Sequence, residues 1–247
     1  MKNILYSLFV FVTFISVVFA QDNYPTISER YPQTFDFLKS LPKDSVVLTW
    51  IDEGKEIIDN AQLEVVSAYP SPKLVEIGAF AGGYSGPTES DEKLVDISTF
   101  FITTDEKTAS SIARKYNVRY ILVTHDILFK QHWIQGLATS CEPYSECPKY
   151  AFIQSTDPNL EQIRNSPEMG ELIEISGGYY LVPNELKNTI FNRMYFEDNS
   201  LDNFKLVYSD SGSRIYEVPQ DLIIIYIAIF GIMIVITAII LIKKQKK

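Results

Sequence analysis

The sequence predicts an α/β protein with a mixed sheet and flanking helices, followed by one C-terminal transmembrane helix. Three observations predict this fold class. Short apolar runs at 44–50, 63–69 and 118–124 alternate with segments of helical character, an order that favours parallel strands joined by helices. Residues 204–218 contain two strand-like segments around turn residues, which is typical of a closing hairpin. Residues 222–242 then form a stretch of 21 residues without a charge.

The N-terminus has the features of a signal peptide. One lysine precedes an apolar run over residues 4–19, and Val18 and Ala20 have the small side chains that signal peptidase recognises before its cleavage point. An uncleaved signal anchor is the alternative interpretation. We therefore expect a signal peptide over 1–20 and an extracytoplasmic domain over 21–220.

The C-terminal region predicts a membrane anchor. As a helix, the uncharged stretch within 221–242 would be about 31 Å long, which is enough to cross the hydrocarbon core of a bilayer. Four lysines follow within 243–247. Because such lysines stay on the cytoplasmic side, we expect a single-pass protein of the cell membrane with a cytoplasmic tail and its domain outside.

The expected domain is strongly acidic. All 31 acidic residues but only 17 of the 22 basic residues lie within 21–221, which gives a net charge of about −14. This charge argues against nucleic acid as a partner and against adhesion to anionic lipid surfaces. The domain is long enough for a single large core, and it shows no internal repeat.

Cys141 and Cys147 are the only cysteines of the chain. In an oxidising compartment, two cysteines this close in sequence are expected to form a local disulfide that holds a loop; free thiols are the alternative. The two histidines, His125 and His132, are too few to complete a metal site with them. The second cysteine also argues against Cys141 as a catalytic nucleophile, so we expect neither metal, nor cofactor, nor catalytic residue.

The first half of the domain is predicted to begin with a helix. Apolar residues spaced three or four apart indicate this helix over 27–41, and Pro42 ends it. The next expected elements are a strand over 44–50 that ends at Asp52-Glu53-Gly54, a helix that begins within 55–61, a strand over 63–69 and a glycine-rich loop over 79–87.

The second half begins with a predicted helix over 92–103. Thr104 is the expected N-cap of a further helix that runs to Tyr116, with Asn117 as its stop, and a buried strand over 118–124 follows. The remaining expected elements are a helix that starts at 126–133, a loop over 136–167, a strand and hairpin over 171–182, a helix over 184–195 and a hairpin over 204–218.

Four stretches of the sequence have an order and spacing that match a known family. They are 44–54, 103–124, the residues Asp126, Lys130 and Ile134 at spacings of four, and the closing segment 189–218. In this order they resemble the C-terminal soluble domain of the oligosaccharyltransferase catalytic subunit, the AglB-like family of archaea and its eukaryotic relatives. The resemblance covers nearly the whole expected domain, and together with the composition it indicates an archaeal host.

The resemblance implies a candidate peptide-binding site. In the family, a Trp-Trp-Asp element supported by an Asp/Lys/Ile helix holds the hydroxyl of the sequon's serine or threonine, because indole N–H groups donate and a carboxylate accepts. The positions that match are Trp50, Asp52, Gly54, Asp126, Lys130 and Ile134.

The motif is degenerate at two positions. Ile51 replaces the second tryptophan, which removes one hydrogen bond to the hydroxyl at a cost of about 1 kcal/mol. Glu53 replaces the tyrosine and is expected to add an uncompensated charge. A purely structural interpretation is also open: Trp50 belongs to the core, Asp52 caps the next helix, and Asp126 with Lys130 forms an ordinary i,i+4 ion pair.

The resemblance also bears on catalysis. The family's metal-binding acids lie in a polytopic N-terminal membrane domain, whereas this sequence opens with one apolar segment. We therefore predict a non-catalytic, membrane-anchored module that binds exported polypeptide or a polytopic oligosaccharyltransferase in N-glycosylation. The alternative is a structural or cell-envelope protein that keeps the fold without sequon binding.

Overall fold

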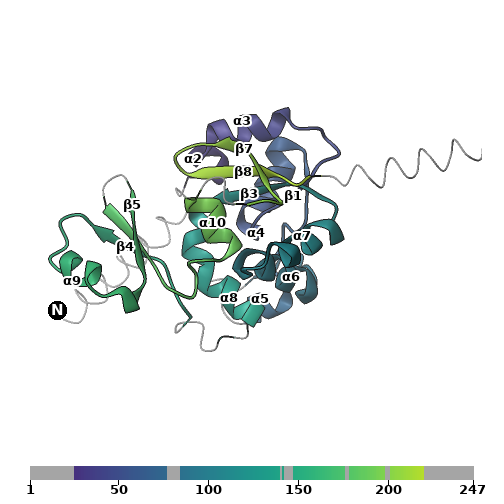
Figure 1. Ribbon diagram of the computed structural model, residues 1–247. Helices are drawn as coiled ribbons and strands as arrows, with labels where there is room; N and C mark the ends of the chain where they lie inside the picture. The colour runs from purple at the N-terminus through teal and green to yellow at the C-terminus, as the bar shows by residue number, and fades with distance from the viewer. Residues whose placement is uncertain are drawn as a thin grey trace, which may run out of the picture.

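A computed structural model gives the fold of the protein (Figure 1). It describes residues 25–76, 84–139, 141, 147–175, 178–197 and 201–219. The expected signal peptide, transmembrane helix and tail lie outside these residues, as does most of the predicted glycine-rich loop. Within the described part of the chain, no helix is both long and apolar enough to cross a bilayer.

The main body contains a five-stranded mixed sheet in the order β2-β1-β3-β8-β7. Its strands are β1 (Val46–Leu48), β2 (Glu64–Val65), β3 (Val118–Thr124), β7 (Lys205–Ser209) and β8 (Ser213–Glu217). Strand β1 pairs in parallel with both β2 and β3, whereas β8 pairs antiparallel with β3 and with β7. The predicted α/β class, the parallel strands and the closing hairpin are therefore confirmed.

Two apolar clusters lie on opposite faces of this sheet. Ile121 and Val123 belong to the larger cluster, and Tyr120 and Leu122 belong to the smaller one. This division follows from the alternation of side chains along a strand, and it explains why β3 is apolar on both faces. The helices α6 (Asp91–Ile102), α7 (Glu106–Lys115), α8 (Gln131–Thr139) and α10 (Ile190–Phe196) contribute to the larger cluster.

The other face is covered by the N-terminal helices, which correct one prediction. The helix expected over 27–41 is divided into α2 (Ile27–Arg30) and α3 (Pro32–Ser40). Tyr31 lies between them with φ −125° and ψ 57°, outside the helical region. The cause is Pro32, because the ring of a proline disfavours helical backbone in the residue before it.

Several other elements differ from the predictions. Helix α4 (Ile51–Glu56) begins directly after β1 and continues into the π-helix η2 (Ile57–Ala61), so the Trp-Ile-Asp-Glu-Gly motif is helical. The strand expected over 63–69 is only the two-residue β2, and α5 (Pro72–Glu76) follows it. Asp105, and not Thr104, caps α7, because its carboxylate accepts from the N–H groups of Lys107 and Thr108.

In the second half, the loop predicted over 136–167 is partly wrong. It contains β4 (Ala151–Gln154) and α9 (Leu160–Arg164), and η5 (Pro167–Met169) follows. The helix predicted over 184–195 begins only at Ile190, where Thr189 caps it by accepting from the N–H of Asn192 at 3.2 Å. Asn117 has φ 52° just beyond α7, as expected of a helix stop.

A separate three-stranded antiparallel sheet lies beside the main body, on the left in Figure 1. Its order is β4-β6-β5, with β5 (Glu171–Ile175) and β6 (Gly178–Val182) forming the predicted hairpin. Tyr180 of β6 is only 4% exposed and belongs to the larger apolar cluster. One face of the small sheet is therefore packed against the main body.

Candidate functional site

Two segments far apart in the sequence meet at one edge of the main sheet. Helix α4 follows β1, and the 3-10 helix η3 (His125–Lys130) follows β3. Because β1 and β3 are parallel neighbours, their carboxyl ends lie together, where open α/β sheets place ligand sites. Lys130 Nζ lies 3.1 Å from Asp52 Oδ2. We call Asp52, Glu53, Asp126 and Lys130 the strand-end site.

Asp52 and Lys130 are the exposed members of this site. Their side chains keep 34% and 40% of their accessible surface, respectively. Asp52 lies in the first turn of α4 and not at its N-cap, which is Trp50. A carboxylate in the first turn is stabilised by the positive end of the helix dipole. The ion pair therefore forms a polar contact that a ligand can reach.

Trp50 and Gly54 have structural roles in this fold. Trp50 is 2% exposed and belongs to the larger apolar cluster, as the structural interpretation of the motif expected. A Cβ added to Gly54 would lie 2.4 Å from the carbonyl oxygen of Ser67 and 2.9 Å from the Cα of Ala68. Only glycine allows α4 to approach the backbone after β2 this closely.

The Asp126, Lys130 and Ile134 series does not form one ligand-facing row. Residues 125–130 form a 3-10 helix, in which positions four apart do not stack. Asp126 Oδ1 instead accepts from Arg30 Nη1 of α2 at 2.5 Å, so the i,i+4 ion pair with Lys130 does not form. Ile134 of α8 is fully buried in the core.

Glu53 is a buried carboxyl group, with only 1% of its surface exposed. Its Oε1 accepts from the hydroxyl of Thr124 at 2.7 Å, and its Oε2 has no partner among the described residues. Burial, followed by the nearby charge of Asp52, raises the pKa of Glu53 to about 8. The group is therefore neutral at pH 7, which corrects the expectation of an uncompensated charge here.

An aromatic group beside the site was not predicted. The Nε2 atom of His125 hydrogen-bonds the hydroxyl of Tyr180, and the His125 ring lies edge-on to Phe129 with centroids 5.2 Å apart. Burial lowers the pKa of His125, so the ring is neutral at pH 7. Phe129 is 57% exposed, next to the strand-end site. No local pattern marks these residues, because their partners come from other elements.

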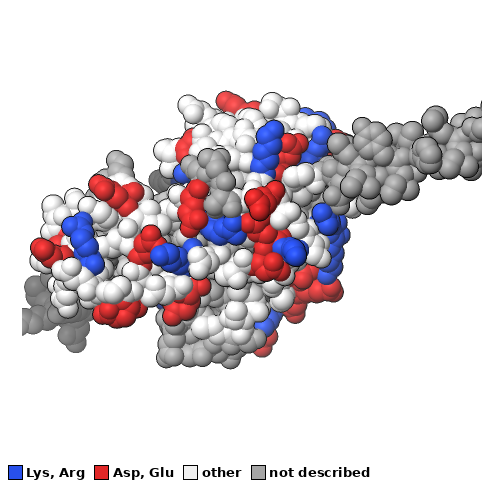
Figure 2. Space-filling model, viewed as in Figure 1, with Lys and Arg blue, Asp and Glu red and all other residues white. Residues whose placement is uncertain are grey.

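The predicted disulfide, any metal ligands and the surface charges can each be compared with the structure. The structure joins Cys141 and Cys147 by a disulfide, with Cα atoms 5.9 Å apart. Among the described residues, no three His, Cys, Asp or Glu side chains are grouped as metal ligands. Acidic and basic side chains are interspersed on the face seen in Figure 2.

The fold places the chain among α/β domains with a mixed sheet and an added antiparallel sheet. It is similar to the C-terminal globular domain of an oligosaccharyltransferase from Archaeoglobus fulgidus, at 17% identity and a TM-score of 0.48, over 79% of this chain and 99% of that domain. It is also similar to the PglB C-terminal domain of C. jejuni, at 10% identity and a TM-score of 0.49, over 75% and 98% of the two chains.

A third similar structure is a longer protein. It is the A. fulgidus oligosaccharyltransferase tethered to an acceptor peptide with the NVT sequon, at 16% identity and a TM-score of 0.42. The likeness covers 68% of this chain and 18% of that one. No protein-family model matches the sequence, and no curated protein matches it.

Proposed function

We propose that this protein is a membrane-anchored, extracytoplasmic, oligosaccharyltransferase-like module that binds exported polypeptide or a polytopic oligosaccharyltransferase in N-glycosylation. The observation that supports it most directly is the contact between Asp52 and Lys130 at 3.1 Å. It joins the two segments whose counterparts in the resembled family hold the sequon hydroxyl.

The chemistry of the exposed pair suits a hydroxyl ligand. The ammonium of Lys130 donates hydrogen bonds and the carboxylate of Asp52 accepts them, so a hydroxyl inserted between them is satisfied in both roles. Phe129 adds an exposed apolar surface for the rest of the ligand. Trp50 acts only through packing, because it is buried in the larger apolar cluster. This arrangement differs from an indole-lined pocket, and we expect weaker discrimination between sequon and other peptides.

The expected anchor at 221–242 would keep the strand-end site close to the membrane and to a polytopic partner there.

The proposal is tested by recovering partners of the tagged full-length protein from detergent-solubilised membranes of its host. We expect the polytopic oligosaccharyltransferase or its peptide substrates to be recovered, and Lys130→Ala to reduce this recovery. Lys55→Ala is the matched control, because Lys55 of α4 also forms an exposed ion pair, with Asp59 of η2. No recovery, together with unchanged glycosylation of surface proteins after deletion, would favour the structural or envelope role.

A further inference from the structure

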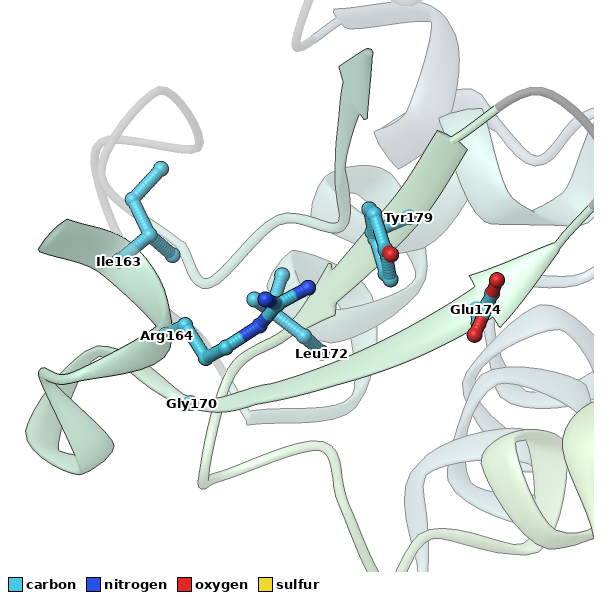
Figure 3. Close-up of a pocket in the computed structure, with 6 residues that line it drawn as sticks. All are labelled: Ile163, Arg164, Gly170, Leu172, Glu174 and Tyr179. Atoms are coloured by element: carbon cyan, nitrogen blue, oxygen red, sulfur yellow. The ribbon is translucent and has the colours of Figure 1, made fainter. Parts of the chain in front are cut away.

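A pocket lies on the small sheet, outside the strand-end site (Figure 3). Its volume is about 380 Å³, within the range of roughly 300–1,000 Å³ that small-molecule sites occupy. It is lined by Ile163 and Arg164 of α9, by Gly170, Leu172 and Glu174 at β5, and by Tyr179 of β6. We call it the outer-face pocket.

The strand geometry explains why these side chains converge. Tyr180 faces the main body, so its neighbour Tyr179 faces the opposite side of the sheet. Glu174 is the partner of Tyr179 across the β5–β6 ladder, and Leu172 lies on the same face two residues earlier. In Figure 3 the ring of Tyr179 lies between the guanidinium of Arg164 and the carboxylate of Glu174. Arg164 Cζ is 5.4 Å from the ring centroid.

Arg164 and Glu174 are the two charged side chains of the pocket. Neither Arg164 nor Glu174 forms a hydrogen bond or ion pair with another residue in the described part of the chain. By contrast, Glu171 of the same strand pairs with Lys187 at 2.6 Å. The donors of Arg164 and the acceptors of Glu174 are therefore available to a ligand.

The composition of the pocket limits the class of ligand. One guanidinium and one carboxylate balance each other, so neither an anion nor a cation gains a net attraction. Ile163, Leu172 and the Tyr179 ring supply an apolar floor. A matching ligand is neutral, has one apolar face, and carries hydroxyl groups at its rim.

We propose that the outer-face pocket binds a neutral pyranose sugar. The C–H face of the ring packs against Tyr179 and Leu172, while hydroxyls at opposite ends of the sugar accept from Arg164 and donate to Glu174. A peptide is a poorer match, because sheets bind peptides through the hydrogen bonds of an edge strand, and these side chains project from a sheet face. The inference is independent of the proposed function and of the strand-end site.

The test is ligand-observed saturation-transfer NMR on the full-length protein in phosphatidylcholine nanodiscs, which avoid sugar-based detergents. The probes are methyl β-D-glucopyranoside and methyl β-D-galactopyranoside. We expect saturable transfer to ring C–H protons of at least one probe, with a Kd of about 1–10 mM, as for a single small ring. Arg164→Ala and Glu174→Ala should each weaken binding at least about tenfold. Glu171→Ala, the control on the same strand, should not.

Three results would overturn the proposal. The first is no saturable transfer up to about 50 mM of either sugar. The second is equal transfer in the wild type and in both pocket variants, since that places the sugar elsewhere. The third is tighter binding of glucose 6-phosphate or of the tripeptide Gly-Leu-Gly than of either neutral sugar, which would define an anion or a peptide site. Both variants replace exposed side chains, and unchanged unfolding temperatures would show that they are folded.

Discussion

The strand-end site and the outer-face pocket use charged side chains in opposite ways. At the strand ends, Lys130 pairs with Asp52 and Arg30 pairs with Asp126, while Glu53 is buried and neutral. In the outer-face pocket, Arg164 and Glu174 flank a tyrosine ring and form no ion pair within the described part of the chain. The ion pairs of the strand-end site contribute to the stability of the fold, so a ligand that binds there must compete with them. In the outer-face pocket, we expect ligand binding to depend on Arg164 and Glu174. The stability of the fold is not expected to depend on them.

The largest effect is expected at Gly54, where α4 lies against the backbone after β2. Gly54→Ala should lower the free energy of unfolding by about 2–3 kcal/mol, or roughly 5–10 °C in Tm, because the new Cβ would overlap the backbone of Ser67. Thermal unfolding of the full-length protein measures this. Gly86→Ala is the control, since a Cβ there meets only the movable end of the Tyr84 side chain. Equal, small shifts in both variants would contradict the close approach at α4.

The second prediction concerns the buried carboxyl of Glu53. Its pKa is about 8 in the folded protein and near 4.5 when unfolded, so the folded state keeps a proton that the unfolded chain releases. The stability that this group contributes is therefore full below pH 4.5 and is lost as the pH rises through 8, at up to about 1.4 kcal/mol per pH unit.

Glu53→Gln removes this titration while keeping the shape of the side chain. Denaturant unfolding at several pH values between 5 and 9 should show the wild type losing stability relative to the variant as the pH rises. If the difference between the two proteins does not change with pH, Glu53 is not neutral at pH 7.

The third prediction concerns the partly buried Arg30–Asp126 pair. Asp126→Ala should destabilise the fold by about 1–2 kcal/mol, because it removes a charge-assisted hydrogen bond between α2 and η3. Denaturant unfolding measures the change. Lys55→Ala, which removes the exposed Lys55–Asp59 pair, should have no measurable effect. A loss no larger than that of the control would mean that this pair is as weak as a surface pair.

The smallest effect on stability is expected at the outer-face pocket. Arg164→Ala should leave the unfolding midpoint unchanged within error, since Arg164 is exposed and makes only its contact with the Tyr179 ring among the described residues. Chemical unfolding monitored by fluorescence checks this. A destabilisation comparable with that of Asp126→Ala would remove the contrast between the two regions.

Local patterns were sufficient to predict several elements. The strand at Val118–Thr124 has the predicted bounds, because a seven-residue stretch of mainly apolar and β-branched residues after a helix stop leaves few alternatives. Patterns failed where distant contacts decided the outcome. Residues 151–154 form a strand only because β6 lies beside them, and a short segment of mixed polarity gives no local signal for this.

The candidate site could be located from the sequence but not described from it. The motif order indicated that the segments around Asp52 and Lys130 belong together, and the structure places these two residues in contact. The role of each residue was not predictable, since Trp50, Gly54 and Ile134 were candidates for binding and the fold uses all three in packing. A motif records residue type and spacing, whereas exposure depends on what packs over the residue.

By itself, the sequence determined the α/β class, the parallel strands, the closing hairpin, and the two segments that form the strand-end site. The class, the strands and the hairpin follow from hydrophobic periodicity and turn residues, which act over a few residues. That the two segments belong to one site is what the family resemblance implies. Only the tertiary structure decided that Asp126 pairs with Arg30, that Glu53 is neutral, and that Arg164 and Glu174 flank one tyrosine. Charge pairing and pKa depend on distance and burial in space, and these are set by elements far apart in the chain.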